Sequence, residues 1–261
     1  LGIQALDCGY KVAVLTVDPS SEKSGGSILG DKTRMTLLAA RPQAFVRPSP
    51  AGVTRGGVAA RTRECVYLCE AAGFDLVIVE TIGVGQVELT VAGITDILLL
   101  LLLPGTGDEL QGMKRGAMEL ADLVVVNKAD GPMRNVALAT VADYRQALRL
   151  TRQSPFGEEV EVIAVSALED QGIAEVLQKL FKLHEKRRES GVLATRRAEQ
   201  CRDWLWQAIR EEILESMVGK ISPQDGMTEL EREVVAGRLT ASSAARQIVN
   251  EYTGRHSGGV T

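Results

Sequence analysis

Two apolar runs, each ending in polar residues and glycine, constrain the fold of this chain more than any other feature. They are Leu76–Gly85 (LVIVETIGVG) and Val124–Asp130 (VVVNKAD). Runs rich in β-branched apolar residues are typical of buried strands in a parallel sheet, and such sheets bind ligands beyond the carboxyl ends of their strands. The sequence therefore predicts an α/β fold with a ligand site near Glu80 and Asp130.

The second run ends in Asn127-Lys128-Ala129-Asp130, a tetrapeptide suited to guanine. The Asp130 carboxylate can accept hydrogen bonds from both the N1–H and the exocyclic amine of guanine, a pattern that adenine does not offer. Asn127 can tie the loop together and reach the base edge, and the aliphatic stem of Lys128 can lie along the purine face. These residues predict a site for a guanine nucleotide, with its phosphates directed towards Glu80.

Strand-like runs alternate with helical segments over the first two thirds of the chain. The other predicted strands are Lys11–Val17, Ala44–Arg47, Asp96–Leu103, Asp122–Val126 and Val160–Val165. This alternation predicts a mostly parallel sheet with helices on both faces.

No strand pattern recurs after Ile173, so we expect an α/β domain at residues 1–189 and a helical arm at residues 190–261. The arm should contain short helices near Thr228–Ala236 and Ala241–Tyr252. Its first part carries an apolar stripe at helical spacing, formed by Trp204, Leu205, Ala208, Ile209 and Ile213. The stripe can pack on its own domain or on a partner subunit.

Three carboxylates fall at or just after predicted strand ends: Asp18, Asp31 and Glu80. At the carboxyl edge of a parallel sheet, such groups can hold a hydrated magnesium ion or orient a water molecule. Each alone also fits a helix cap or a solvated loop, and Asp31 fits the first of these roles. Gly83 lies where a backbone N–H could contact a γ-phosphate.

Composition narrows the function classes further. A net charge of −4 and only 4% aromatic residues argue against a general nucleic-acid binder. The apolar run Ile97–Leu103 is far shorter than the roughly 20 residues that span a bilayer, so no membrane association is expected.

Cys65 and Cys69 fit buried helix thiols better than half a metal site. The charged run Glu185–Arg188 is predicted to be a solvated helix face.

The phosphate-binding loop G-x-x-x-x-G-K-[ST] does not occur in the 261 residues. The first residues, LGIQALDCGY, fit the last turns of an amphipathic helix that ends near Gly9. In nucleotide-binding folds of this kind the loop precedes such a helix. We therefore expect a fragment or processed form of a longer protein, whose first strand and phosphate loop precede Leu1.

Several longer motifs resemble, in order and spacing, one known family. They are VAVLTVDPSS, GGSILGDKTRM, RPSP, GFDLVIVETIGVGQ, GDELQGMKRG, ELADLVVVNKADG and SAL. Together they resemble the MeaB/ArgK-type GTPases, the group that includes the human methylmalonic aciduria type A protein. These are P-loop GTPases of the SIMIBI metallochaperone class and act as chaperones of adenosylcobalamin-dependent methylmalonyl-CoA mutase. The resemblance is dense over residues 1–190 and looser over the helical arm.

The resemblance implies roles for the phosphate end of the site. Asp18 and Asp31 correspond to the magnesium and switch I carboxylates of the family. Glu80 and Gly83 match the Glu-x-x-Gly that replaces the usual Walker B Asp-x-x-Gly. The implied catalytic residues are Asp31, Glu80 and Gly83, and the implied metal ligands are Asp18, Asp31 and Glu80.

It also implies roles for the base end and for partner signalling. Asn127, Lys128 and Asp130 match the guanine reader, and its supporting loop corresponds to Ser166, Ala167 and Leu168. Gln111 and Lys114 fall in a segment that the family uses as an additional switch signalling to the mutase. The residues alone would favour a surface loop and a helix N-terminus at these two positions.

The leading hypothesis is a GTPase that uses Mg²⁺ with GTP or GDP and assists cobalamin loading and protection of methylmalonyl-CoA mutase or a related acyl-CoA mutase. Cobalamin would sit only in the partner enzyme. The resemblance implies a homodimer built partly from the helical arm. Bacterial cytoplasm and mitochondrial matrix both fit as compartments.

Two other interpretations stay open. The missing phosphate loop favours a non-hydrolysing dimeric scaffold that contacts the mutase. A nickel-delivery GTPase of the same class is disfavoured because the chain has no Cys/His cluster.

Overall fold

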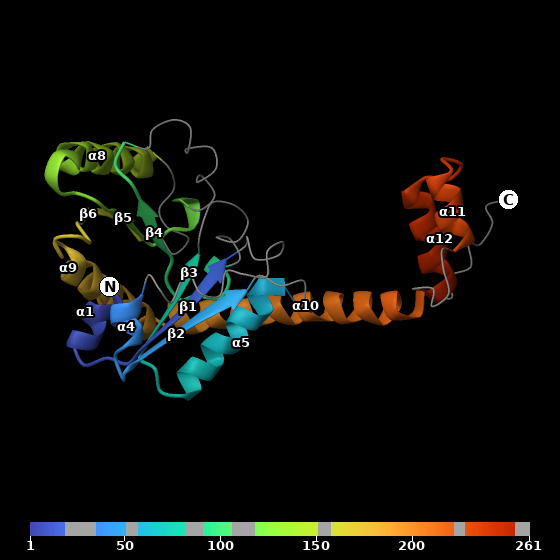
Figure 1. Cartoon of the computed structure of the whole chain (residues 1–261), viewed down its shortest axis with the longest axis horizontal. Helices are drawn as coiled ribbons and strands as arrows, with labels where there is room; N and C mark the ends of the chain where they lie inside the picture. The colour runs from blue at the N-terminus through green and yellow to red at the C-terminus, as the bar shows by residue number, and fades with distance from the viewer. Residues whose placement is uncertain are drawn as a thin grey trace. The chain divides into compact units, whose positions relative to one another are not determined.

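The computed structural model describes residues 1–18, 35–50, 57–81, 91–105, 118–150, 158–221 and 228–253 (Figure 1). The chain divides into two compact units, Leu1–Trp204 and Leu205–Thr261. The division falls inside helix α10 (Val192–Ile221), and the expected domain boundary after residue 189 stays a prediction. Each unit is described by itself below.

The first sheet has three parallel strands in the order β2 (Ala44–Pro50), β1 (Val12–Asp18) and β3 (Leu76–Thr81). The central strand, β1, is the most deeply buried of the three, as expected for an apolar run with neighbours on both sides. Alternate side chains of β1 point to opposite faces: Val12 and Val14 belong to one core cluster, and Ala13 and Leu15 to another.

Helices cover both faces of this sheet. On the Val12 face, α1 (Gly2–Asp7) and α4 (Thr36–Ala39) contribute to the core. On the Ala13 face, α5 (Gly57–Ala71) contributes the buried thiols of Cys65 and Cys69. Both cysteines are therefore core residues, as expected for apolar helix positions.

The second sheet is also parallel, with the order β4 (Leu99–Leu102), β5 (Leu123–Val126) and β6 (Glu161–Ala164). All four residues of β5 are buried. Helix α8 (Arg134–Leu150), which follows the short 3-10 turn η2 (Gly131–Met133), packs on one face.

Helix α9 (Ile173–Glu189) links the two sheets. Its Val176 packs in the core of the second sheet, whereas the adjacent Leu177 packs in the core of the first. Phe181, one turn further on, stacks on Tyr10 with ring centroids 4.6 Å apart. Two adjacent faces of α9 therefore hold the two sheets in a single unit.

The predicted strands are present, with two differences. Strand β4 begins at Leu99 rather than Asp96, because residues 96–98 are held by side chains from other elements. The described strands form two separate three-stranded sheets rather than one, and β3 and β4 do not pair with each other.

The second unit consists of the C-terminal part of α10 with α11 (Glu229–Val235) and α12 (Ala241–Thr253). Both short helices agree with the sequence prediction. Thr228 caps α11, since its side chain accepts a hydrogen bond from the backbone N–H of Glu231 and the Glu231 side chain returns one. None of the helices in the described ranges is long and apolar enough to cross a membrane.

The predicted apolar stripe of α10 divides between the two units. Trp204 packs on its own domain, with Tyr67 edge-on to its ring and the Arg63 guanidinium 5.3 Å from its centroid. Further along the helix, Leu205 and Ile213 are more than half exposed, as are Trp206 and Leu214.

Candidate functional site

The Asn127–Asp130 loop follows β5 and is fixed by backbone bonds to both neighbouring strands. The Asn127 N–H donates to Leu102 O at the end of β4 (2.9 Å). The Ala129 N–H donates to Val165 O just after β6 (2.9 Å). Since β4, β5 and β6 are parallel, these contacts gather three strand ends at one edge of the sheet.

The Asn127 side chain joins this loop to the one after β6. Its Oδ1 accepts from the backbone N–H of Lys128 (2.8 Å) and from that of Ala167 (3.0 Å). Lys128 has a φ of 60°, in the left-handed region that non-glycine residues rarely adopt. Such a conformation persists where surrounding contacts enforce it, and it is common at ligand sites.

Ser166 positions Asp130. Its Oγ donates to Asp130 Oδ1 at 2.6 Å and accepts from the backbone N–H of Glu169 at 3.0 Å. Ser166 is only 1% exposed, and its backbone exchanges two hydrogen bonds with Gln171. The serine is therefore a rigid support for the carboxylate.

Gly172 explains why the chain turns so tightly behind Ser166. It has a φ of +77°, and a Cβ at this position would lie 3.1 Å from a Val165 side-chain carbon and 3.2 Å from Ala164 O. Only glycine fits both the conformation and the space. The turn starts α9 and closes the Ser166 loop.

The Asp130 carboxylate keeps capacity for further donors. Within the described part of the chain, Ser166 Oγ is the one group that hydrogen-bonds to it. An ionised carboxylate has about four acceptor positions, so two N–H groups of a base can be added without displacing the serine. The half-buried setting strengthens such bonds relative to water.

Glu80 lies at the carboxyl edge of the other sheet. It is exposed near the end of β3, and its register partner on β1 is Thr16, two residues before Asp18. The backbones of Asp18 and Glu80 therefore reach the same sheet edge. The Asp18 side chain lies outside the described part of the structure, as do Asp31, Gly83, Gln111 and Lys114.

Of the predicted residues, the structure thus brings together Asn127, Asp130, Ser166 and Ala167. Lys128 lies in the same loop with an exposed side chain, and Leu168 is 86% exposed. Within the described ranges there is no group of three or more His, Cys, Asp or Glu side chains that could hold a metal ion.

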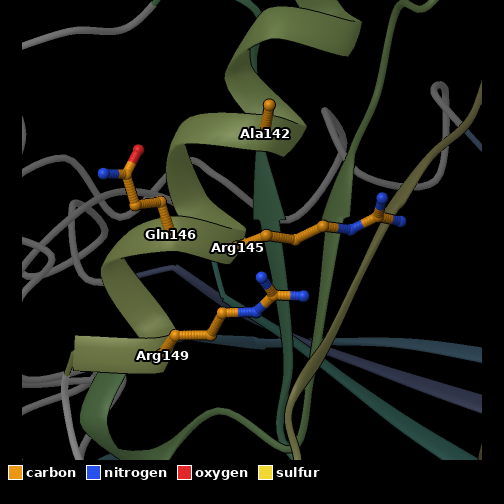
Figure 2. Close-up of a pocket in the computed structure, with 4 residues that line it drawn as sticks. All are labelled: Ala142, Arg145, Gln146 and Arg149. Carbon is orange, nitrogen blue, oxygen red and sulfur yellow. The ribbon is translucent and has the colours of Figure 1, made fainter.

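A shallow pocket lies on α8, away from these residues, and is lined by Ala142, Arg145, Gln146 and Arg149 (Figure 2). Arg145 donates from Nη2 to Val162 O at 2.7 Å, so its guanidinium supports β6. None of the sequence-predicted site residues lines this pocket.

Sequence reasoning missed a buried ionic cluster. Arg187, within the run expected to be a solvated helix face, is only 1% exposed, and that expectation is wrong for this residue. Its guanidinium donates to Asp122 Oδ1 (2.5 Å) and Glu158 Oε2 (2.8 Å). No local pattern signals this burial, because both carboxylates are distant in sequence.

A parallel α/β fold with an Asn-Lys-x-Asp loop resting on a serine loop defines the class of P-loop GTPases. A solved structure described as LAO/AO transport system kinase aligns with a TM-score of 0.70 and 32% identity, covering 97% of this chain and 75% of that chain. Within the class, the chain belongs to the MeaB family. The family model described as "Methylmalonyl Co-A mutase-associated GTPase MeaB" matches residues 1–222.

Several named relatives agree with this assignment. A probable GTPase of Mycobacterium tuberculosis (strain ATCC 25618 / H37Rv) is 45% identical over 249 residues, which cover 95% of this chain and 74% of the relative. The mitochondrial methylmalonic aciduria type A homolog of Mus musculus is 42% identical over 248 residues, covering 95% and 60%. GTPase ArgK of Escherichia coli (strain K12) is 47% identical over 207 residues, covering 79% and 62%. The family resemblance and the fold class predicted from the sequence are confirmed.

Proposed function

We propose that this chain binds guanine nucleotides and hydrolyses GTP as part of a protein that assists methylmalonyl-CoA mutase. The observation that carries the proposal is the contact between Ser166 Oγ and Asp130 Oδ1, together with the Asn127 bridge to Ala167. These contacts hold an acceptor-only carboxylate at a strand edge before any base arrives. Preorganisation of this kind lowers the cost of binding.

In the proposed complex, Asp130 accepts from the guanine N1–H and exocyclic amine. The aliphatic part of Lys128 covers the purine face, and the exposed Leu168 borders the base. Adenine carries no hydrogen at N1 and has its amine at a different ring position, so it pairs poorly with Asp130. The site therefore favours guanine over adenine.

The phosphate end of the proposal rests on Glu80, Asp18, Asp31 and Gly83. The backbone ends of β1 and β3 support it, because they bring Asp18 and Glu80 to one sheet edge. The carboxylates would hold Mg²⁺ directly or through water, and the ion would neutralise charge developing on the transferred phosphoryl group. Glu80 would orient the attacking water. Gln111 and Lys114 would carry the signal to the mutase.

The partner in this proposal is an adenosylcobalamin-dependent acyl-CoA mutase, and cobalamin belongs to that enzyme. The family description names methylmalonyl-CoA mutase, and relatives are named after methylmalonic aciduria. The protein would assist loading and protection of the cofactor in the bacterial cytoplasm or the mitochondrial matrix. The exposed apolar residues of α10 support a homodimer.

A non-hydrolysing scaffold is the second candidate. The observation in its favour is that the 261 residues contain no G-x-x-x-x-G-K-[ST] motif. A chain without this motif would bind the nucleotide weakly, mainly through contacts to its base, and would hydrolyse little or no GTP.

The deciding experiment is a titration with GDP and GTP, in the presence of Mg²⁺, of the 261-residue chain beside a version that carries a strand and a phosphate-binding loop ahead of Leu1. Phosphate release is measured on both. Guanine-specific binding with GTP hydrolysis by either version supports the proposed function. Guanine-specific binding without hydrolysis by either version supports the scaffold. If neither version binds, the nucleotide assignment is wrong.

A further inference from the structure

The turn that leads into β4 is held by side chains from three helices. It comprises residues Val91–Asp96, which begin ten residues after the end of β3 at Thr81. The polar groups that hold its carbonyl oxygens come from α5 (Arg63), α9 (Arg187) and α10 (Arg196 and Gln200).

Helix α10 contacts the turn at two places. Arg196 donates from Nη2 to Ala92 O (3.1 Å) and from Nε to Thr95 O (3.1 Å). Gln200, one helical turn later, donates from Nε2 to the same two oxygens, at 3.4 Å and 2.9 Å. Two neighbouring side chains of one helix therefore hold both ends of the turn.

Arg63 closes the arrangement from α5. Its Nη2 donates to Gly93 O (2.6 Å), and its Nη1 donates to Gln200 O on α10 (2.9 Å). The same guanidinium lies over the ring of Trp204. One side chain thus connects the turn, the backbone of α10 and a tryptophan.

The turn and α10 should move together because these groups are buried. Arg63 is 8% exposed and Arg196 is 9% exposed. The oxygens that these side chains hold are the backbone carbonyls of Ala92, Gly93 and Thr95. Moving the turn without α10 would leave buried guanidinium groups without these acceptors, which is costly.

The position of the turn suggests its use. It lies on the chain path that starts at Glu80, and α10 continues beyond Trp204 into the second compact unit. We propose that Arg196 and Gln200 couple the nucleotide state at the Glu80 end of the site to helix α10. This inference rests on the proposed function. Coupling of this kind is reciprocal. A partner that binds to and shifts α10 would change the affinity for GTP by the same factor by which GTP changes the affinity for that partner.

Trp204 provides a reporter at this junction. The chain has two tryptophans, Trp204 and Trp206, so Trp206→Phe leaves Trp204 as the single tryptophan, which is excited selectively at wavelengths that tyrosine does not absorb. In the Trp206→Phe protein, in whichever version of the chain binds nucleotide, Trp204 emission is compared between the GDP complex and the complex with a non-hydrolysable GTP analogue. We expect the two spectra to differ.

Gln200→Ala in the same background removes both of its bonds to the turn. We expect the affinity for GDP to stay within about threefold. The factor by which exchange of GDP for the GTP analogue shifts the conformational equilibrium of α10 should fall by about fivefold or more, the low end of typical allosteric coupling. The emission difference should shrink accordingly. Arg196→Lys is a second variant, because an ammonium group does not span both oxygens.

Gln207→Ala is the matched control on the same helix, since Gln207 bonds to Glu211 on the surface. Its emission difference should match that of the Trp206→Phe parent. A parent that binds both nucleotides with identical Trp204 emission would overturn the inference and leave the proposed function intact, as would a full response in Gln200→Ala and Arg196→Lys. A folded parent that binds neither nucleotide would overturn the proposed function, and the inference with it.

Discussion

At the scale of single residues, Asp130 determines which base the site accepts. In Asp130→Asn, one carboxylate oxygen becomes an amide NH₂ group, which cannot accept from the guanine amine. We expect the affinity for GDP and GTP to fall by at least about tenfold, which corresponds to the loss of one charge-assisted hydrogen bond. Affinity for xanthosine diphosphate should rise, because its C2 oxygen can accept from the new amide. Competition binding measures both changes, and an unaltered guanine preference would refute the role of Asp130.

Gly172 acts at the scale of the loop element. Gly172→Ala combines a positive φ with close contacts to Val165 and Ala164 O, so the Ser166 loop must shift. We expect the free energy of unfolding to fall by about 2 kcal/mol and the affinity for GDP to decrease, because Ser166 no longer positions Asp130.

Gly237→Ala is the control for this change, because Gly237 has a φ of +72° but a Cβ added there would meet no atom within 4 Å. It should cost only the backbone strain, about 1 kcal/mol, and leave GDP affinity unchanged. Chemical denaturation and GDP titration test both variants. Equal losses in the two would show that crowding at Gly172 is unimportant.

The ion cluster that fixes α9 is also an element-scale feature, and it predicts a pH dependence. Burial by itself raises the pKa of Glu158, but hydrogen bonds from Lys186 and Arg187 outweigh it, so the pKa lies below its usual value of 4.5. A carboxyl whose pKa is lowered by folding stabilises the protein above its unfolded pKa and loses this effect as the pH falls through the folded value.

Glu158→Gln should therefore lower the free energy of unfolding by about 1–3 kcal/mol at pH 7. The difference from the parent should shrink as the pH is lowered below about 4.5. Urea unfolding at several pH values gives the comparison. Glu185→Gln is the control: its partner Arg188 is exposed, and such pairs contribute little. A difference that does not depend on pH would mean that Glu158 acts through packing rather than charge.

At the scale of the whole molecule, the exposed apolar residues of α10 predict self-association. Ile213 and Leu214 are 54% and 63% exposed, so a partner that covers them would gain free energy from burial of their apolar surface. Ile213→Glu should raise the dimer dissociation constant by about tenfold or more, because it places a charge in the proposed interface. Sedimentation velocity measures the change. Gln207→Glu adds the same charge outside this apolar pair, and an equal effect of both variants would point to net charge instead.

The sequence by itself determined which secondary-structure element precedes the base end of the site and which hydrogen-bonding groups that end carries. The apolar run before Asn127 predicted the buried strand β5, because a run of four consecutive apolar residues can be recognised from the local sequence alone. The tetrapeptide that follows predicted a guanine reader, because hydrogen-bonding capacity is a property of each side chain. The Ser166–Leu168 loop was associated with it through the family resemblance alone.

Only the tertiary structure decided how these parts meet. Arg187 sits in a charged run that resembles a solvated helix face, yet Asp122 and Glu158, at sequence separations of 65 and 29, bury it. Arg196 and Gln200 likewise have polar side chains with no local signal, and their acceptors lie about a hundred residues earlier. Periodicity reports how one element faces its surroundings. The partners of a buried charge are chosen by contacts between elements, which no local pattern contains.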